Sequence, residues 1–309
     1  MTRSRARKPT PGKHRPGKHP RGKRPEGKPF FARLPRLAWV LIALAVVGTV
    51  VFIRLYPTTS PPSDSLGVPR AAIVDQLYNL QENPYFIAEV TAELEEYGFA
   101  VSLHQGDDID VDFYRSLPTH GYRLLVLRVH SGLLGEEGQV HTPTQLFTNE
   151  PYSRHIHQTD QAAGRLAMGM PDPRQPGLFS IGPTFVTDRM LGAFDDTVVI
   201  LMGCGGIYLE DMAEAFIQKG ASAYVAWDLN VVLHYVDEAT PYLIRQLCSE
   251  HATIQQALDR TMAAYGSDPK YGARLEYYPS GIGYKTLEEL AHIEFPAEDD
   301  TTALPAGND

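Results

Sequence analysis

The hydrophobic residues of the main part of the chain fall into short continuous runs that alternate with longer stretches of helical spacing. The continuous runs are typical of strands buried on both faces, and they occupy residues 71–77, 99–103, 123–129, 197–202 and 222–227. Apolar positions three and four residues apart predict helices over residues 84–97, 111–117, 209–219, 236–248 and 253–265. Gly98 and Gly220 follow two of these stretches, at the place where a helix commonly ends on glycine.

This alternation predicts an α/β fold, with a mainly parallel sheet sandwiched between helices. Residues 138–147 alternate between apolar and polar positions, which favours a hairpin, and residues 274–278 predict a final edge strand. In sheets of this kind the functional site lies beyond the carboxyl ends of the strands.

A separate apolar run, residues 37–53, contains no charged residue. At 1.5 Å per residue it is slightly short of a hydrocarbon layer about 30 Å thick. Trp39 and Tyr56 suit the two interfaces, and Arg54 can extend toward water. A cleaved signal peptide is the alternative, but its apolar region is normally about 7–15 residues long and ends in small residues. We therefore expect a single uncleaved transmembrane helix over residues 37–54.

Charge is distributed very unevenly along the 309 residues. Residues 1–36 carry 13 Lys and Arg and a single acid, Glu26, whereas residues 55–309 carry 14 Lys and Arg against 36 Asp and Glu. Positive residues stay on the cytoplasmic side of a membrane span. The sequence thus predicts a protein of the plasma membrane that crosses it once, with the N-terminus cytoplasmic and the main domain extracytoplasmic.

The chain divides on this basis into five parts. Residues 1–36, with a Gly-Lys pair every five residues among prolines, are expected to be a disordered cytoplasmic tail. The basic tail and residues 37–54 would both contact lipid, while a cytoplasmic protein or nucleic-acid ligand for the tail stays an alternative. Residues 55–69 predict a Pro/Ser linker, 70–294 the α/β domain, and 295–309 a disordered acidic tail. The acidity of the main domain argues against nucleic-acid binding there.

Three reactive residue types follow three of the predicted strands. His130 follows residues 123–129, Cys204 follows 197–202, and Asp228 follows 222–227. A cysteine nucleophile needs a neighbouring base, which His130 would supply if its strand and that of Cys204 are neighbours. Glycine backbone N–H groups can approach an oxyanion closely, so Gly132 and Gly205 are candidate donors. Asp228 would either line a pocket for a basic side chain or cap the segment that follows.

Other interpretations of these residues stay open. A single cysteine after a buried strand is often a small core residue, and a single histidine there is often structural. The α/β-hydrolase pattern G-x-[SC]-x-G fails because position 202 is Met, and no phosphate-binding glycine motif follows the first strand. His141, His155 and His157 lack a further ligand at a telling spacing, so no metal and no cofactor is predicted. A Cys204–Cys248 disulfide is a minor alternative.

The segments RLLVLRVHSG and TVVILMGCGG resemble the caspase-like cysteine peptidases, the group that contains caspases, gingipains and the CHAT domains. The segments DMAEAFIQKGA, SAYVAWD and TIQQAL continue the resemblance, which spans roughly residues 70–285 and is most specific between 123 and 260. It implies that His130 is the catalytic histidine and Cys204 the nucleophile. Ser131 departs from the pattern, because the family places glycine directly after the histidine.

The resemblance also implies a selecting pocket, often for Arg, Lys or Asp, where Asp228 is the candidate carboxylate. Some relatives bind calcium, for which the pairs Glu136/Glu137 and Asp195/Asp196 are candidates, although ordinary solvated charge is the preferred interpretation. The sequence therefore predicts a membrane-anchored cysteine endopeptidase that acts on peptides or proteins. The alternatives are a catalytically inactive caspase-like binding or sensing module and a structural surface protein.

Overall fold

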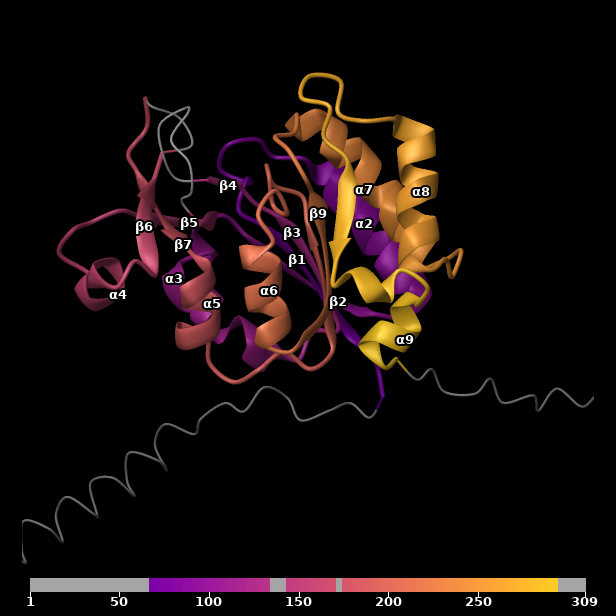
Figure 1. Ribbon diagram of the computed structural model, residues 1–309, viewed down its shortest axis with the longest axis horizontal. Helices are drawn as coiled ribbons and strands as arrows, with labels where there is room; N and C mark the ends of the chain where they lie inside the picture. Colours follow the sequence, from indigo (N-terminus) through magenta and orange to yellow (C-terminus); the bar gives the residue numbers. More distant parts are fainter. Residues whose placement is uncertain (1–66, 134–142, 171–173, 294–309) are drawn as a thin grey trace, which may run out of the picture. The chain divides into compact units, whose positions relative to one another are not determined.

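A computed structural model describes residues 67–133, 143–170 and 174–293 (Figure 1). Its central feature is a six-stranded sheet in the order β10-β9-β8-β3-β1-β2. The strands are β1 (Arg70–Asp75), β2 (Ala100–Gln105), β3 (Leu124–Arg128), β8 (Thr197–Leu201), β9 (Ala221–Trp227) and β10 (Leu275–Tyr278). All neighbours pair in parallel except β10, which runs antiparallel to β9 at the edge. The predicted mainly parallel sheet and its edge strand are confirmed.

Alternate residues of the central strands face two separate hydrophobic cores. In β3, Leu124 and Val126 join one core, and Leu125 and Leu127 join the other. Helices α2 (Pro84–Tyr97), α7 (Leu233–Leu247), α8 (Ile254–Tyr265) and α9 (Leu287–Ala291) cover the first face, and α3 (Val111–Ser116), α5 (Pro183–Arg189) and α6 (Asp211–Gln218) cover the second (Figure 1). Because helices cover both faces, both strand faces are apolar, which explains the continuous runs in the sequence.

The helix ends follow local rules that the sequence displays. The side chain of Asn83 accepts a hydrogen bond from Phe86 N–H at the start of α2, and Gly98 ends this helix in the left-handed conformation. Thr253 and Gln256 form a capping box at the start of α8. The predicted bounds of α2 are confirmed, while α7 begins three residues before the predicted position 236.

A second, four-stranded antiparallel sheet lies beside the central one, in the order β4-β5-β7-β6. It consists of β4 (Ser131–Leu133), β5 (Thr144–Pro151), β6 (Leu166–Gly169) and β7 (Leu178–Ile181), with the short helix α4 (Gln158–Ala162) between β5 and β6. The sequence indicated only the hairpin over residues 138–147, of which 138–142 lie outside the described residues. β3 ends at Arg128 and β4 begins at Ser131, so the chain passes directly from the carboxyl end of β3 into the second sheet.

A buried ion cluster fastens three elements together at the carboxyl edge of the central sheet. Arg128, the last residue of β3, is fully buried. Its Nη1 donates to Asp75 of β1 at 2.7 Å, and its Nε and Nη2 donate to the two oxygens of Asp237 of α7 at 2.8 and 2.9 Å. Asn83 donates a further hydrogen bond to Asp237 at 2.9 Å. Both carboxylates are buried, so the guanidinium is their principal compensation.

We expect Arg128→Met to lower the free energy of unfolding by about 3–5 kcal/mol, because it leaves two carboxylates buried without a cation. Thermal and denaturant unfolding of the full chain would measure this. The variant Arg128→Met/Asp75→Asn/Asp237→Asn is the matched control and should recover part of the loss, since it removes the buried charges as well. Equal stability of the single and triple variants would contradict the compensating role of Arg128.

The membrane interpretation concerns a part of the chain that the structure does not describe. The predicted span 37–54, the tail 1–36, the linker up to residue 66 and residues 294–309 all lie outside the described residues. Among residues 67–133, 143–170 and 174–293, no helix is both long enough and apolar enough to cross a membrane.

Candidate active site

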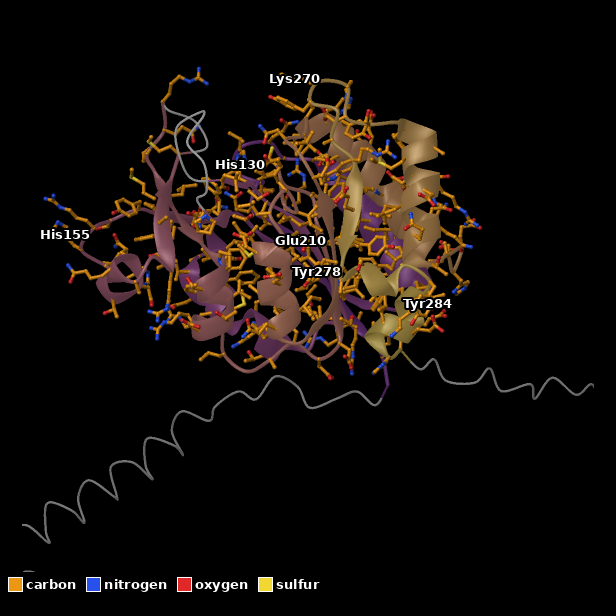
Figure 2. All side chains as sticks on the ribbon, viewed as in Figure 1. His130, His155, Glu210, Lys270, Tyr278 and Tyr284 are labelled. Atoms are coloured by element: carbon orange, nitrogen blue, oxygen red, sulfur yellow. The ribbon has the colours of Figure 1, made fainter. Side chains whose placement is uncertain are left out.

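The strands that precede His130 and Cys204 are direct neighbours. β3 pairs with β8 in parallel, with Leu127 opposite Leu201, and Met202 N–H donates to Leu127 O at 2.9 Å. The residues that follow the two strands therefore emerge at the same carboxyl edge of the sheet. His130 lies toward this edge in Figure 2, whereas Tyr284 lies toward the opposite end. The strand adjacency that a His–Cys pair requires is thus present.

The loops after the two strands are held together by close contacts. Gly203 packs so tightly that a Cβ atom there would lie 2.6 Å from Val129 O and would overlap the Ser131 side chain. Ser131 Oγ donates to Cys204 O at 2.8 Å. Ser131, the residue that departs from the caspase-like pattern, thus has a structural role in joining the histidine loop to the cysteine loop.

His130 is half-buried and has a well-defined environment. Its backbone N–H donates to Gln76 Oε1 at 2.9 Å, and its ring lies beside that of Phe147, with the centroids 5.8 Å apart. Its Nε2 is buried and has no hydrogen-bond partner in the part of the chain that the structure describes. Burial lowers the pKa of the imidazole below its ordinary value of 6.5, and the positive charge of Arg128 lowers it further. The ring is therefore neutral at pH 7, the form that can accept a proton.

Cys204 has a half-buried thiol that contacts one backbone residue. Val231 N–H donates to Sγ at 3.5 Å, and Sγ donates to Val231 O at 3.7 Å. Burial raises the pKa of the thiol above its ordinary value of 9.0, the hydrogen bond with Val231 opposes this, and the negative charge of Asp268 adds to it. Among the described residues, no hydrogen bond joins this thiol to the His130 ring. The directions of the two pKa shifts favour a neutral thiol at Cys204 and a neutral imidazole at His130 at pH 7.

The other cysteine is of a different kind. Cys248 is completely buried in the core on the α7 side of the sheet, and both cysteines are free thiols. Burial also raises the pKa of Cys248 far above its ordinary value. Cys248 therefore serves as a core residue, and the alternative Cys204–Cys248 disulfide is not formed.

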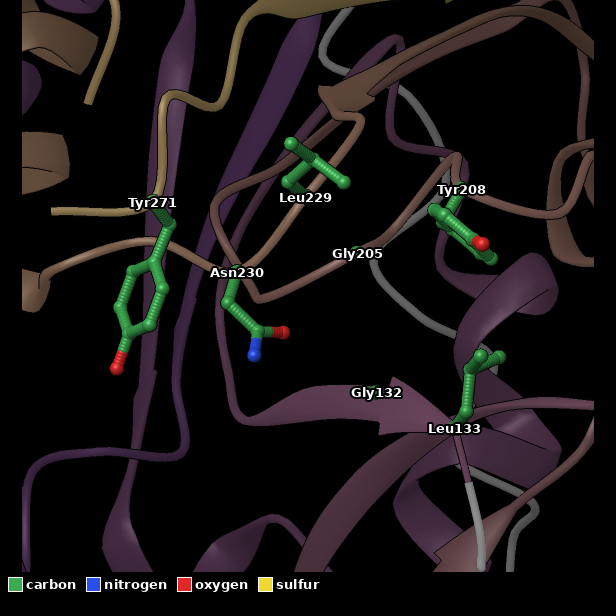
Figure 3. Close-up of a pocket in the computed structure, with 7 residues that line it drawn as sticks. All are labelled: Gly132, Leu133, Gly205, Tyr208, Leu229, Asn230 and Tyr271. Atoms are coloured by element: carbon green, nitrogen blue, oxygen red, sulfur yellow. The ribbon is translucent and has the colours of Figure 1, made fainter. Parts of the chain in front are cut away.

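A cavity of about 290 Å³ lies beside the two loops (Figure 3). Its lining comes from loops and strands that are far apart in the sequence, and it consists of Gly132, Leu133, Gly205, Tyr208, Leu229, Asn230 and Tyr271. Both candidate oxyanion glycines are among these residues. The lining also includes Asn230, the neighbour of Val231, whose backbone contacts the Cys204 thiol.

The two candidate oxyanion donors differ in their surroundings. Gly205 has φ = +56°, which favours glycine, and its N–H donates to Leu229 O at 2.9 Å. This hydrogen bond must open before the Gly205 N–H can bind an oxyanion. Gly132 lies in β4 opposite Gln145 of β5. An oxyanion role for either glycine stays a prediction.

Asp228 bonds to a residue distant in sequence, rather than to the segment that directly follows it. Its Oδ1 accepts a hydrogen bond from Arg274 N–H at 2.7 Å, and its own N–H donates to Arg274 O at 3.0 Å. These contacts connect the end of β9 to the start of β10. Its neighbours Leu229 and Asn230 line the cavity, so the role of Asp228 in selecting a basic side chain stays a prediction.

Potential metal ligands are dispersed. Within the described residues, no group of three or more His, Cys, Asp or Glu side chains is arranged to hold a metal ion. His157 Nε2 lies 2.8 Å from Glu150 Oε1, Asp195 pairs with Arg123 at 2.7 Å, and Asp196 lies 2.9 Å from His292. His141, Glu136 and Glu137 lie outside the described residues.

Sequence reasoning missed the residues that position the pair. Gln76 binds the backbone of His130 across 54 residues of sequence, and Val231 contacts Cys204 across 27. Arg128, inside the apolar run of β3, was a signal for the buried ion cluster alone, because a charged residue is rarely buried in a strand without a partner. Its position at the end of the strand indicates that the carboxylates that bind it, Asp75 and Asp237, lie at the carboxyl edge of the sheet.

No family model matches the chain, and no curated protein matches it. Solved structures do match, among them the crystal structure of the Arg-specific cysteine proteinase gingipain R, with 12% sequence identity and a TM-score of 0.36. The match covers 64% of this chain and 42% of the proteinase, so the chain spans less than half the length of that protein. At this TM-score the similarity does not define the fold, which is defined above by its own strand order and register.

We expect iodoacetamide to label Cys204 slowly at pH 7 and faster only as the pH rises beyond about 9, because the thiolate reacts and burial raises the pKa of this thiol. Mass spectrometry of the folded full chain would give the rate at each pH. Cys248 is the internal control and should stay unlabelled until the protein unfolds. A labelling rate that levels off below pH 8 would show that the thiolate already forms in the resting protein.

Proposed function

We propose that this protein is a membrane-anchored, extracytoplasmic cysteine endopeptidase of caspase-like fold, with His130 and Cys204 as its catalytic pair. The observation that carries the proposal is the parallel pairing of β3 with β8, whose carboxyl ends bring both residues to one edge of the sheet. The adjacent cavity offers a place for a substrate side chain. The resemblance of RLLVLRVHSG and TVVILMGCGG to the caspase-like peptidases points to the same pair.

In this proposal the neutral pair becomes reactive only when substrate is bound. The sulfur of Cys204 forms a bond to the scissile carbonyl carbon as its proton passes to His130, and hydrogen bonds of this kind often shorten once substrate binds. His130 then gives the proton to the amine nitrogen as the C–N bond breaks. Water next attacks the thioester, so that the second product leaves as a carboxylic acid and the thiol is restored.

Membrane anchoring is supported by sequence alone. Residues 37–53 form an uncharged apolar run, and the Lys and Arg residues are concentrated before it. This pattern favours a cytoplasmic N-terminus and an extracytoplasmic α/β domain. Peptides or proteins outside the cytoplasm would then be the substrates.

A second candidate function, a peptide-binding or sensing module without turnover, is favoured by the contacts of the thiol. Cys204 Sγ is engaged with the Val231 backbone, and the Gly205 N–H is engaged with Leu229 O. Ser131 separates His130 from Gly132. If these contacts persist in the complex, the cavity would hold a peptide without attack on its backbone.

We expect Cys204→Ala to abolish the hydrolysis of fluorogenic peptides by the full chain in detergent, because the bond-forming atom is removed. His130→Ala should reduce kcat about 10²–10⁴-fold, the usual contribution of a general base. A mixture of peptides that carry each of the common amino acids before the scissile bond serves as the substrate.

Cys248→Ala is the matched control, because it removes the other thiol, which lies in the core away from the cavity. Thermal unfolding would establish that all three variants are folded. Hydrolysis by Cys204→Ala at the wild-type rate would overturn the peptidase proposal. Absence of hydrolysis by the wild type, together with peptide binding that is equal in the wild type and Cys204→Ala, would favour the binding module.

The membrane anchor makes a separate prediction. The full chain should stay in the membrane pellet after alkaline carbonate extraction, whereas Leu44→Arg/Val47→Arg should move to the supernatant. Each arginine at the centre of a span costs about 2.5–3.5 kcal/mol of insertion free energy. Thr58→Arg/Thr59→Arg, in the predicted linker, is the charge-matched control and should stay in the pellet. Extraction of the wild type by carbonate would contradict the anchor.

A further inference from the structure

The lining of the cavity beside Cys204 contains no charged side chain among the described residues. Its side chains are two leucines, two tyrosines and one amide, from Leu133, Leu229, Tyr208, Tyr271 and Asn230. Figure 3 shows Tyr208 and Leu133 around one part of the cavity and Tyr271 with Asn230 around another. Ligand sites that bind charged groups normally present an opposite charge, so this lining favours an uncharged ligand.

The carboxylates near this cavity are already occupied by backbone donors. Asp268 is only 2% exposed, and its two oxygens accept hydrogen bonds from the N–H groups of Val232, Lys270 and Tyr271 at 2.7–2.9 Å. Asp228 Oδ1 accepts from the Arg274 N–H. A lysine or arginine side chain that entered the cavity would meet no carboxylate among the described lining residues, and leaving water without one is unfavourable.

One exposed cation lies at the edge of the cavity. The exposed ammonium group of Lys270 lies 4.6 Å from the centroid of the Tyr271 ring, which lines the cavity. Figure 2 shows Lys270 toward the same edge of the molecule as His130. This ammonium group would repel an arginine or lysine side chain, with the negative charge of Asp268 offsetting part of the repulsion, whereas a neutral side chain would meet no repulsion.

The size and exposure of the cavity suit one large apolar side chain. Its volume of about 290 Å³ is roughly twice that of a cavity of about 150 Å³ that accommodates benzene. Tyr208 is 58% exposed, Leu133 43%, Tyr271 41% and Leu229 37%. A leucine, methionine or phenylalanine side chain in this position would remove part of this apolar surface from water, which stabilises the complex.

We propose that this cavity binds an uncharged apolar side chain, of the Leu, Met or Phe kind, from the residue that directly precedes the bond attacked by Cys204. The inference rests on the proposed peptidase function and assigns it a substrate class. It differs from the expectation that Asp228 selects a basic side chain. Gly205, the residue after the proposed nucleophile, lines the cavity, so a peptide whose carbonyl faces Cys204 could place its preceding side chain there.

The test compares tripeptide amides with a fluorogenic leaving group that differ only in the last residue, namely Leu, Phe, Arg, Lys or Asp. The full chain in detergent should cleave the Leu and Phe peptides with a kcat/KM at least ten times that for Arg or Lys. Leu229→Asp should shift the preference toward Arg at least tenfold, because it introduces an unpaired carboxylate into the lining. Leu191→Asp, at another exposed leucine outside this lining, should leave the preference unchanged.

A binding measurement separates this inference from the peptidase proposal. Calorimetry of Cys204→Ala with N-acetyl-Ala-Ala-Leu-amide and with the Arg counterpart does not depend on turnover. Tighter binding of the Leu peptide without any hydrolysis by the wild type would support the apolar cavity and overturn the peptidase. Faster cleavage after Arg, equal or no binding of the two peptides, or an unchanged preference in Leu229→Asp would overturn the inference.

Discussion

The burial of Arg128 between two carboxylates is the constraint on which the candidate site depends. A guanidinium inside an α/β core is tolerated only where its donors are matched, and Asp75 and Asp237 meet that need from β1 and α7. The match fixes α7 against the carboxyl edge of the sheet. It also places a permanent positive charge two residues before His130, which favours the neutral imidazole.

The same edge is held together by hydrogen bonds that cross between loops. Gln76 binds the His130 backbone, Ser131 binds Cys204 O, and the Val231 backbone contacts the thiol. These bonds connect the ends of β1, β3, β8 and β9. The loops that carry His130 and Cys204 are thereby joined beside a cavity whose lining includes exposed tyrosines and leucines.

Much of the fold was predictable because most strands of the central sheet are short apolar runs, and a helix follows β1, β2, β8 and β9. The location of His130 and Cys204 at the carboxyl edge followed from parallel pairing alone. The order of the strands in the sheet could not be predicted in this way. Leu124–Arg128 and Thr197–Leu201 are about 70 residues apart, and an apolar run of this kind can pair with any other strand of the sheet. The strands β6 and β7, of four residues each, are too short to show a period. The contacts of Gln76 and Val231 were also beyond reach, since a partner distant in sequence leaves no local pattern.

The engagement of the Cys204 thiol with the Val231 backbone has a consequence for chemical durability. Peroxide oxidises the thiolate far more readily than the thiol, so a buried sulfur that retains its proton is slow to form a sulfenic acid. In oxidising surroundings outside a cell, many proteins protect their cysteines by pairing them in disulfides. In this protein a backbone carbonyl and a backbone amide contact the sulfur, so we expect slow oxidation by peroxide even without a second cysteine beside it.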